Sequence, residues 1–254
     1  IPAPTEFAKL SPSPVAVAIA NSLLSGEPRA VLLGNAAAHH PQTAQLHVIA
    51  QWIAHHTDAQ FGYLTEGANT VGGYLANAVP ADRAVAQSFF RQPKKAYLVL
   101  HAEPELDCAN PQQARAALDQ AEMVVLMSPY KHGTEYADVL LPVAPFSETS
   151  GTFVNAEGRV QGFNGTTRPL ADTRPAWKVL RVLGNLLALD GFNYESSEDI
   201  RAELLGARNL DTVDVSARLN NQSDAPLPTL GTHTAETERV ADVPLYFTDG
   251  IVRR

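Results

Sequence analysis

The sequence predicts an α/β protein built on a doubly wound, mostly parallel sheet, with a β-hairpin excursion and C-terminal helices. Three observations support this prediction. Short, nearly continuous apolar runs alternate with stretches of helical periodicity, which is the pattern of a parallel sheet covered by helices on both faces. Glycine or polar residues follow the apolar runs, as expected where strands leave a sheet. A segment after the last apolar run has the residue pattern of a hairpin.

Five apolar runs are the predicted strands. They are Ala30–Leu33, Phe61–Leu64, Ala96–Leu100, Met123–Met127 and Val139–Leu141. Right-handed crossovers would place the loops that follow the first, third, fourth and fifth strands along one edge of one sheet. Ligands bind at this edge in open α/β sheets, so we expect any site to lie there.

Helical periodicity and capping residues predict the helices. They cover Val15–Leu24, Pro41–Thr57, Asp82–Arg91, Pro111–Asp119, Arg174–Asp190 and Ser197–Leu205, with Asn110 and Thr173 as N-caps. The chain becomes polar from Asp211 to Gly231, which is typical of a surface linker, and Val243–Phe247 could add an edge strand. We therefore expect an α/β domain at residues 1–206 and a polar linker with an extended tail at residues 207–254.

The fold is organised around the segment Asp138–Gln161. Its apolar start ends at two prolines and continues into the polar loop Ser147–Gly151, which leaves the carboxyl end of a strand. Gly151–Gln161 then has two alternating arms around the turn Ala156–Gly158, which predicts a hairpin.

Composition excludes several classes of function. The chain has 254 residues and a formal net charge of −8, and nothing in it suggests a surface for nucleic acid or an anionic membrane. One cysteine excludes an internal disulfide and a cluster held by four of the chain's own thiolates. The sequence lacks Gly-x-Gly-x-x-Gly and Gly-x-Ser-x-Gly, which disfavours an NAD site of that type and a hydrolase.

The histidines and the cysteine do not predict a reactive site. Five of the eight histidines lie between His39 and His56, where helical positions on one face are separated by roughly 10–12 Å, too far for one metal ion. Cys108 stands beside two carboxylates, which work against a thiolate. We predict no catalytic and no metal-binding residue in this chain.

Three segments carry a resemblance to known families. Tyr136–Gln161 resembles the loop and hairpin that follow the dinucleotide-binding sheet in the molybdopterin oxidoreductase family. Glu66–Tyr74, which reads Glu-Gly-Ala-Asn-Thr-Val-Gly-Gly-Tyr, and Pro244–Phe247 are similar to the large iron–sulfur subunit (the 75 kDa subunit) of NADH:quinone oxidoreductase, respiratory complex I. The resemblance implies the fold of the third domain of molybdopterin oxidoreductases.

The resemblance also implies a function and its partners. The chain would be a C-terminal piece of this subunit, in agreement with its start at Ile1, and would serve as a scaffold in the electron-transferring peripheral arm. It would hold no cofactor, because the iron–sulfur clusters belong to an N-terminal part of the parent chain. The partners would be that cluster-bearing domain and neighbouring peripheral-arm subunits, on the cytoplasmic side of the bacterial inner membrane and without direct membrane insertion.

Two alternatives remain open. The chain could be the dinucleotide-binding part of an active, formate dehydrogenase-like molybdopterin oxidoreductase, with molybdopterin guanine dinucleotide as its cofactor. It could also be a free-standing nucleotide-binding module of the flavodoxin kind.

A vestigial dinucleotide pocket has eight candidate residues. They are Gly34, Asn35, Asn69, Glu103, Ser128, Glu148, Thr152 and Asn155. In molybdopterin enzymes the hairpin contributes to the pocket for one guanine dinucleotide, and Arg159 is a further candidate there. Together with Glu66, the two glutamates of this set could carry out acid–base chemistry, or they could accept hydrogen bonds from loop amides or bind a purine amino group.

Overall fold

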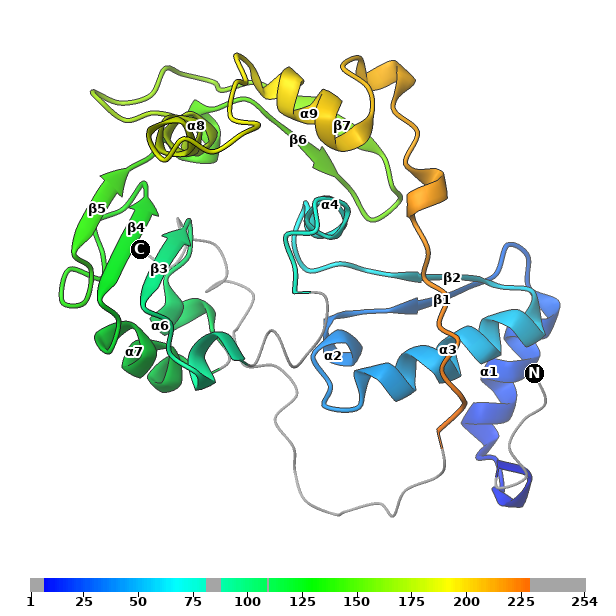
Figure 1. The fold of residues 1–254 in the computed structure, drawn as a ribbon. Coiled ribbons are helices and arrows are strands. Elements are labelled where there is room, and N and C mark those ends of the chain that lie inside the picture. Colours follow the sequence, from blue (N-terminus) through cyan, green and yellow to red (C-terminus); the bar gives the residue numbers. More distant parts are fainter. Residues whose placement is uncertain (1–6, 81–87, 109, 229–254) are drawn as a thin grey trace. The chain divides into compact units, whose positions relative to one another are not determined.

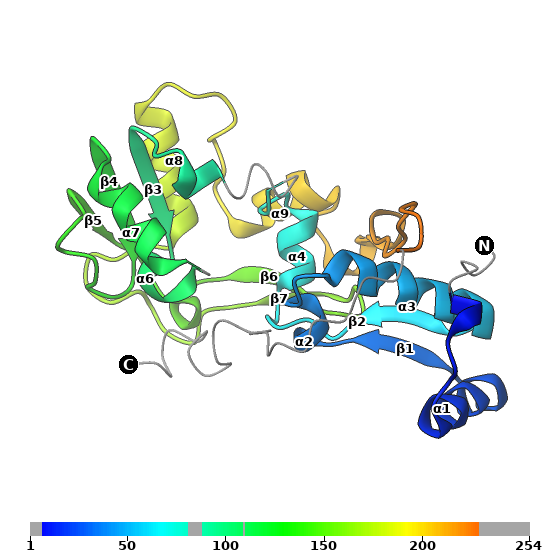
Figure 2. The ribbon, with the colours of Figure 1, turned by 90° about the horizontal axis from the view of Figure 1, so that it is seen from below.

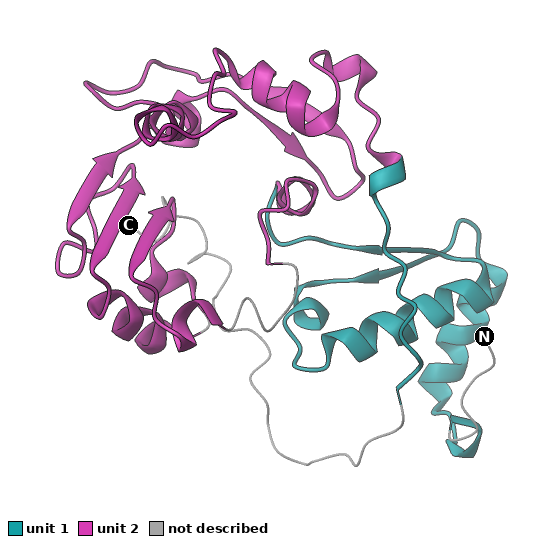
Figure 3. Ribbon diagram, viewed as in Figure 1, with its two compact units in different colours: residues 1–68, 217–242 teal, residues 69–216, 243–254 magenta. Residues whose placement is uncertain are grey.

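The computed structural model describes residues 7–80, 88–108 and 110–228 (Figure 1). The chain divides into two compact units, coloured separately in Figure 3, which comprise residues 1–68 with 217–242 and residues 69–216 with 243–254. Both units contain helices and parallel strands, so the predicted mixed α/β fold is confirmed. The domain limits predicted at residues 1–206 and 207–254 stay a prediction.

The first unit is built on a pair of parallel strands. Its elements are η1 (Phe7–Lys9), α1 (Pro14–Ser25), β1 (Ala30–Leu33), α2 (Asn35–Ala38), α3 (Thr43–Thr57) and β2 (Gln60–Tyr63). α3 runs along β1 and β2 and contacts both, which Figures 1 and 2 show from two sides. Val48, Ala50 and Ala54 of α3 are buried there. The apolar periodicity that predicts this helix therefore marks the face that packs on the strands.

The segment predicted as a surface linker packs on the first unit in part. The Ser223 N–H donates to Gln51 Oε1 at 2.8 Å, and Asn221 O lies 2.6 Å from His47 Nε2. The linker prediction is therefore wrong for these residues. Polar side chains on α3 satisfy the extended backbone, which composition alone does not reveal.

The second unit holds a three-stranded parallel sheet and an antiparallel hairpin. Its elements are α4 (Thr70–Leu75), β3 (Ala96–Leu100), α6 (Pro104–Asp107), α7 (Pro111–Asp119), β4 (Met123–Ser128), β5 (Val139–Pro142), η2 (Phe146–Glu148), β6 (Gly151–Val154), β7 (Val160–Phe163), α8 (Ala176–Leu186), α9 (Ser197–Leu205) and η3 (Leu210–Thr212). The turn η4 (Ser216–Arg218) leads back to the first unit. The strand order is β3–β4–β5, and β6 pairs with β7.

Several predicted helices are confirmed. α1, α7 and α9 match their predicted ranges closely, and Asn110 caps α7 as expected. The predicted cap Thr173 is wrong, because α8 begins after Pro175 and the Thr173 hydroxyl donates instead to Leu170 O. Of the predicted helix 82–91, residues 88–91 are helical and 82–87 lie outside the described residues, as does the predicted edge strand 243–247.

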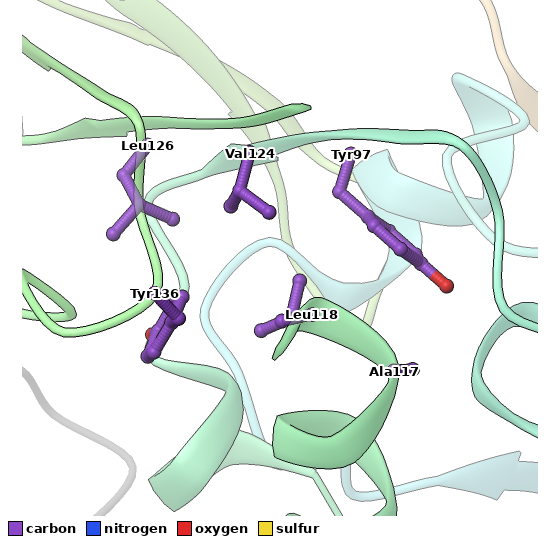
Figure 4. Packing of buried hydrophobic residues seen from close by; sticks show 6 residues of the cluster. All are labelled: Tyr97, Ala117, Leu118, Val124, Leu126 and Tyr136. Carbon is purple, nitrogen blue, oxygen red and sulfur yellow. The ribbon is translucent and has the colours of Figure 1, made fainter. Parts of the chain in front are cut away.

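One face of the β3–β4–β5 sheet forms the main core of the second unit. Figure 4 shows Ala117 and Leu118 of α7 beneath Tyr97, Val124 and Leu126 of the strands, and each of these five is at most 9% exposed. Burial of their apolar surface stabilises the sheet by roughly 25 cal/mol per Å².

Side chains on the opposite face of the sheet differ in exposure. Leu98, Leu100 and Met123 are 48%, 40% and 45% exposed among the described residues, whereas Met127 is buried. That helices cover both faces stays a prediction for this second face. A continuous apolar strand does not by itself reveal which part of the protein covers its second face.

The predicted single sheet is two sheets in the described residues. β1 pairs with β2, and β3–β5 pair separately in the second unit. The loops after β3, β4 and β5 share an edge as predicted, whereas the loop after β1 belongs to the other unit. The separation of the two sheets follows from the segment after β2, because that segment forms α4, which packs on β6.

A side-chain hydrogen bond holds the hairpin to α4. Asn69 Oδ1 accepts from the Val154 N–H at 2.8 Å, and Val154, Leu75 and Val215 form a buried cluster beside it. Two segments that carry the family resemblance, Glu66–Tyr74 and the hairpin, therefore contact each other. Val215 is 4% exposed, so the predicted linker is packed at this point as well.

Asn69→Ala is expected to destabilise the second unit. The Val154 N–H would lose its partner in a residue that is 3% exposed, and an unpaired buried donor costs about 1–3 kcal/mol. Gly72→Ala should act similarly, because a Cβ there would collide with the Asn69 side chain. Urea unfolding measures both variants. Asn185→Ala, an exposed asparagine of α8, is the control, and equal losses for Asn69 and Asn185 would contradict the expectation.

Asp199→Asn is expected to destabilise the protein at pH 7 by an amount that shrinks in acid. Hydrogen bonds within the capping box of α9, the Ser196 hydroxyl first, lower the pKa of Asp199 from 3.8 to about 2. Because the folded pKa is the lower one, the carboxylate's contribution is present above about pH 4 and is lost as the pH falls toward 2. Thermal unfolding across this range measures the difference. A difference between Asp199→Asn and the unchanged protein that stays constant with pH would refute this account. Asp172→Asn, at another exposed aspartate of the same unit, is the control.

Candidate functional site

A polar cleft lies beside the loop that leaves β5. It has a volume of about 610 Å³ and belongs entirely to the second unit. Its walls are the loop after η2, residues 165–169, the start of α8 and the N-terminus of α9. The organising loop predicted from the sequence therefore does border a cavity.

Hydrogen bonds fix the walls of this cleft. Ser147 O accepts from the Thr166 N–H at 2.7 Å, and the Glu148 carboxylate accepts from the Leu170 N–H at 2.9 Å. A Cβ on Gly165 would lie 2.9 Å from the Glu148 carbonyl carbon, so glycine permits this close approach. The hydroxyls of Ser150 and Ser197, 2.8 Å apart, join the loop to α9.

Charged side chains of both signs line the cleft. They are Arg168, Arg174 and Lys178 together with Glu148, Glu195 and Glu198. The Lys178 ammonium lies 5.3 Å from the centre of the Trp177 ring, and Trp177 Nε1 is buried without a hydrogen-bond partner among the described residues. An indole N–H, an aromatic face and cations suit an anionic or purine-like ligand.

The lining does not support catalysis by a nucleophile and base. No histidine or cysteine is among the described residues that line the cleft, and its two central serines hydrogen-bond to each other. A serine nucleophile needs an adjacent base, which this arrangement does not provide. The cleft can therefore bind a ligand but has no set of groups for acyl transfer.

Three of the residues considered from sequence lie in the first unit. Gly34 is the N-cap of α2 and Asn35 is its first residue. Glu66 lies 2.7 Å from His39 Nε2. The predicted single sheet would have placed all three beside the β3–β4–β5 strands, whereas they belong to the unit that holds β1 and β2.

Residues of the hairpin and of α4 hold the backbone. Besides the Asn69 bond to β6, Asn155 Oδ1 accepts from the N–H groups of Glu157 and Arg159 at 3.0 and 2.9 Å and closes the turn. Thr152 Oγ1 lies 3.4 Å from Arg201 Nη1. The side-chain oxygens predicted to face a dinucleotide are thus engaged within the protein.

Two further candidates lie at the carboxyl edge of the sheet. Glu103 is 6% exposed, and Ser128 Oγ accepts from the Tyr130 N–H at 3.1 Å. His101, which ends β3 with φ +53°, has its pKa lowered by burial. Of the eight predicted residues, only Glu148 lines this cleft, and the dinucleotide pocket stays a prediction.

Sequence reasoning missed the aromatic and basic side of the cleft. Trp177 and Lys178 fall within the predicted helix Arg174–Asp190, and neither they nor Arg168 have a predicted role in a site. The available signal was the grouping of Arg168, Arg174 and Lys178 around a tryptophan directly after the hairpin.

Cys108 is partly buried beside two carboxylates. Burial, followed by the charges of Asp107 and Glu105, raises its pKa. A raised pKa disfavours the thiolate, which is the nucleophilic and metal-binding form, and the absence of a reactive role for Cys108 stays a prediction.

Among the described helices, none combines the length and apolar character that a membrane span requires.

Two known proteins are similar in sequence to part of this chain. A protein named "Putative formate dehydrogenase" from Staphylococcus haemolyticus strain JCSC1435 is 33% identical over 93 residues, which are 36% of this chain and 9% of that protein. A protein of the same name from Staphylococcus aureus strain MRSA252 is 35% identical over 91 residues, again 9% of its length. This chain therefore spans only a small part of these relatives.

A family model supplies the broader assignment. The model described as "Molybdopterin oxidoreductase" matches residues 14–186, which are more than half of the sequence. The match includes both parallel sheets and the hairpin. This chain belongs to the molybdopterin oxidoreductase family.

Proposed function

We propose that this chain is a scaffold domain of the large iron–sulfur subunit of NADH:quinone oxidoreductase, without catalytic residues of its own. One observation carries the proposal: Asn69, Glu148 and Asn155, predicted to face a dinucleotide, accept hydrogen bonds from backbone N–H groups of this chain. A family fold can persist where its original site has been given over to structure. The Glu66–Tyr74 segment supports this role, because it holds the hairpin in place.

Exposed apolar surface supports a scaffold role. Leu98, Leu100 and Met123 are partly exposed on the face of the β3–β4–β5 sheet that lies opposite the core. In the first unit, Val15 and Ile19 of α1 are 67% and 56% exposed. Contiguous apolar surface in water marks an interaction site. The partners would be the N-terminal cluster-bearing domain of the same parent chain and neighbouring peripheral-arm subunits, on the cytoplasmic side of the membrane.

A second candidate function is favoured by the relatives' names. Both relatives reported above are named formate dehydrogenases, so the chain could be the dinucleotide-binding part of such an enzyme. The cleft beside Trp177 would then receive one end of molybdopterin guanine dinucleotide, with Arg168 and Lys178 near its phosphates. The predicted pocket residues do not fit this cofactor as a set, which is why we place this function second.

The metal content of the intact parent protein should separate the two functions. We expect the native protein to contain iron but no stoichiometric molybdenum, and to co-purify with NADH-dependent quinone reductase activity. Elemental analysis, pterin fluorescence and both enzyme assays measure this. About one molybdenum per chain together with formate oxidation would establish the second candidate and overturn the first.

Guanine nucleotide binding gives a test on this chain itself. Calorimetry should show no saturable heat at GDP concentrations up to about 1 mM. A dissociation constant of about 1 mM corresponds to a binding free energy of about −4 kcal/mol, so any binding would be weaker than this. Micromolar binding that Lys178→Ala weakens at least tenfold would support the dinucleotide function. Lys95→Ala removes an 86% exposed lysine of the same unit and serves as the control.

A further inference from the structure

A buried histidine faces two carboxylates at the carboxyl edge of the β3–β4–β5 sheet. Glu103 and Glu105 follow β3, and His132 lies in the connection from β4 to β5. Because β3 and β4 are parallel neighbours, both connections leave the sheet at the same edge. One ligand atom from each of the three residues lies within 4.8 Å of the other two.

His132 is the unusual member of this group. Its side chain is only 7% exposed, and neither Nδ1 nor Nε2 has a hydrogen-bond partner among the described residues. Glu105 Oε1 lies 3.9 Å from Nδ1, which is beyond hydrogen-bond distance. Buried polar atoms nearly always have partners, so a buried imidazole with two unpaired nitrogens calls for a ligand.

The two carboxylates are held where such a ligand would sit. The Tyr136 hydroxyl donates to Glu105 Oε2 at 2.8 Å and leaves Oε1 on the side of His132. Glu103 is 6% exposed, and its carboxylate belongs to the same group of ligand atoms.

We propose that Glu103, Glu105 and His132 bind a divalent transition-metal ion, for which Zn²⁺ is the appropriate probe. An imidazole nitrogen with two carboxylate oxygens is a ligand set that zinc accepts, whereas calcium and magnesium prefer oxygen alone. The ion would join the loop after β3 to the loop after β4, and a water molecule would complete a four-coordinate site.

The geometry requires a small closure on binding. Zinc bonds to nitrogen and oxygen of about 2.0–2.2 Å place tetrahedral ligand atoms about 3.4 Å apart. The present separations of up to 4.8 Å would therefore shorten by about 1.4 Å at most. Rotation of the Glu103, Glu105 and His132 side chains can supply this movement.

Zinc titration of the chelator-treated chain tests the proposal. Calorimetry should show one saturable site, and thermal unfolding should shift upward when Zn²⁺ is added. Glu105→Gln and His132→Gln should each weaken binding at least tenfold and abolish the thermal shift. Glu105→Gln keeps the side-chain volume, so it remains informative if the histidine variant does not fold, which circular dichroism would report.

Matched controls address the other histidines and the cysteine. His55 and His56 are adjacent and exposed on α3, so the double change to glutamine should leave zinc binding intact. Cys108→Ser should likewise have no effect, and Co²⁺ bound in place of zinc should show no thiolate charge-transfer band. The absence of saturable zinc binding would overturn the proposal. Binding that survives in Glu105→Gln but is lost in the His55 and His56 double variant would also overturn it.

Discussion

The hydrogen bond from the Val154 N–H to Asn69 Oδ1 is the constraint on which the second unit depends. It ties α4 to the hairpin and positions Val154 against Leu75 and Val215. The hairpin in turn follows the loop that forms one wall of the cleft. Val154 is 3% exposed, so water cannot replace the Asn69 side chain as the acceptor for the Val154 N–H. Position 69 therefore needs an acceptor of this length. Gly72 is required for the same reason, since any larger residue would occupy the space of that acceptor.

Local sequence signals located most elements because local interactions determine them. The capping box at Ser196, the positive-φ glycine at position 206 and Asn110 before Pro111 each mark a helix boundary through contacts within four residues. The sheet division was not predictable in this way. Whether β2 joins β3 depends on where α4 packs, and α4 packs through Asn69 on a strand 85 positions away. Hydrophobic runs report that a strand is apolar but not which strand pairs with it.

The same distinction applies to the sites. Glu148 was predictable because it stands in a loop at a strand end, and it does line the cleft. Trp177 and Lys178 come from the start of α8, where helical periodicity suggests core packing, and Arg168 comes from the loop after the hairpin. The group of Glu103, Glu105 and His132 was missed, since a search for metal ligands at short spacing cannot join residues on two parallel crossovers. The prediction of no metal-binding residue was therefore an inference from local spacing alone.

Membership of the family and the use of the site are separate questions here. The family model fixes the fold over residues 14–186, and relatives named formate dehydrogenases share that fold over a small part of their length. Function depends on whether the side chains at the loops face a ligand or hold the loops themselves. In this chain Asn155 closes its own turn and Asn69 binds β6, so the polar groups nearest the hairpin are engaged in structure. A dinucleotide would have to be held by the basic wall at Lys178 and Arg168 instead. Leu98 and Leu100 on the second face of the sheet are 48% and 40% exposed, and apolar surface of this kind is what the proposed place in a larger assembly would cover.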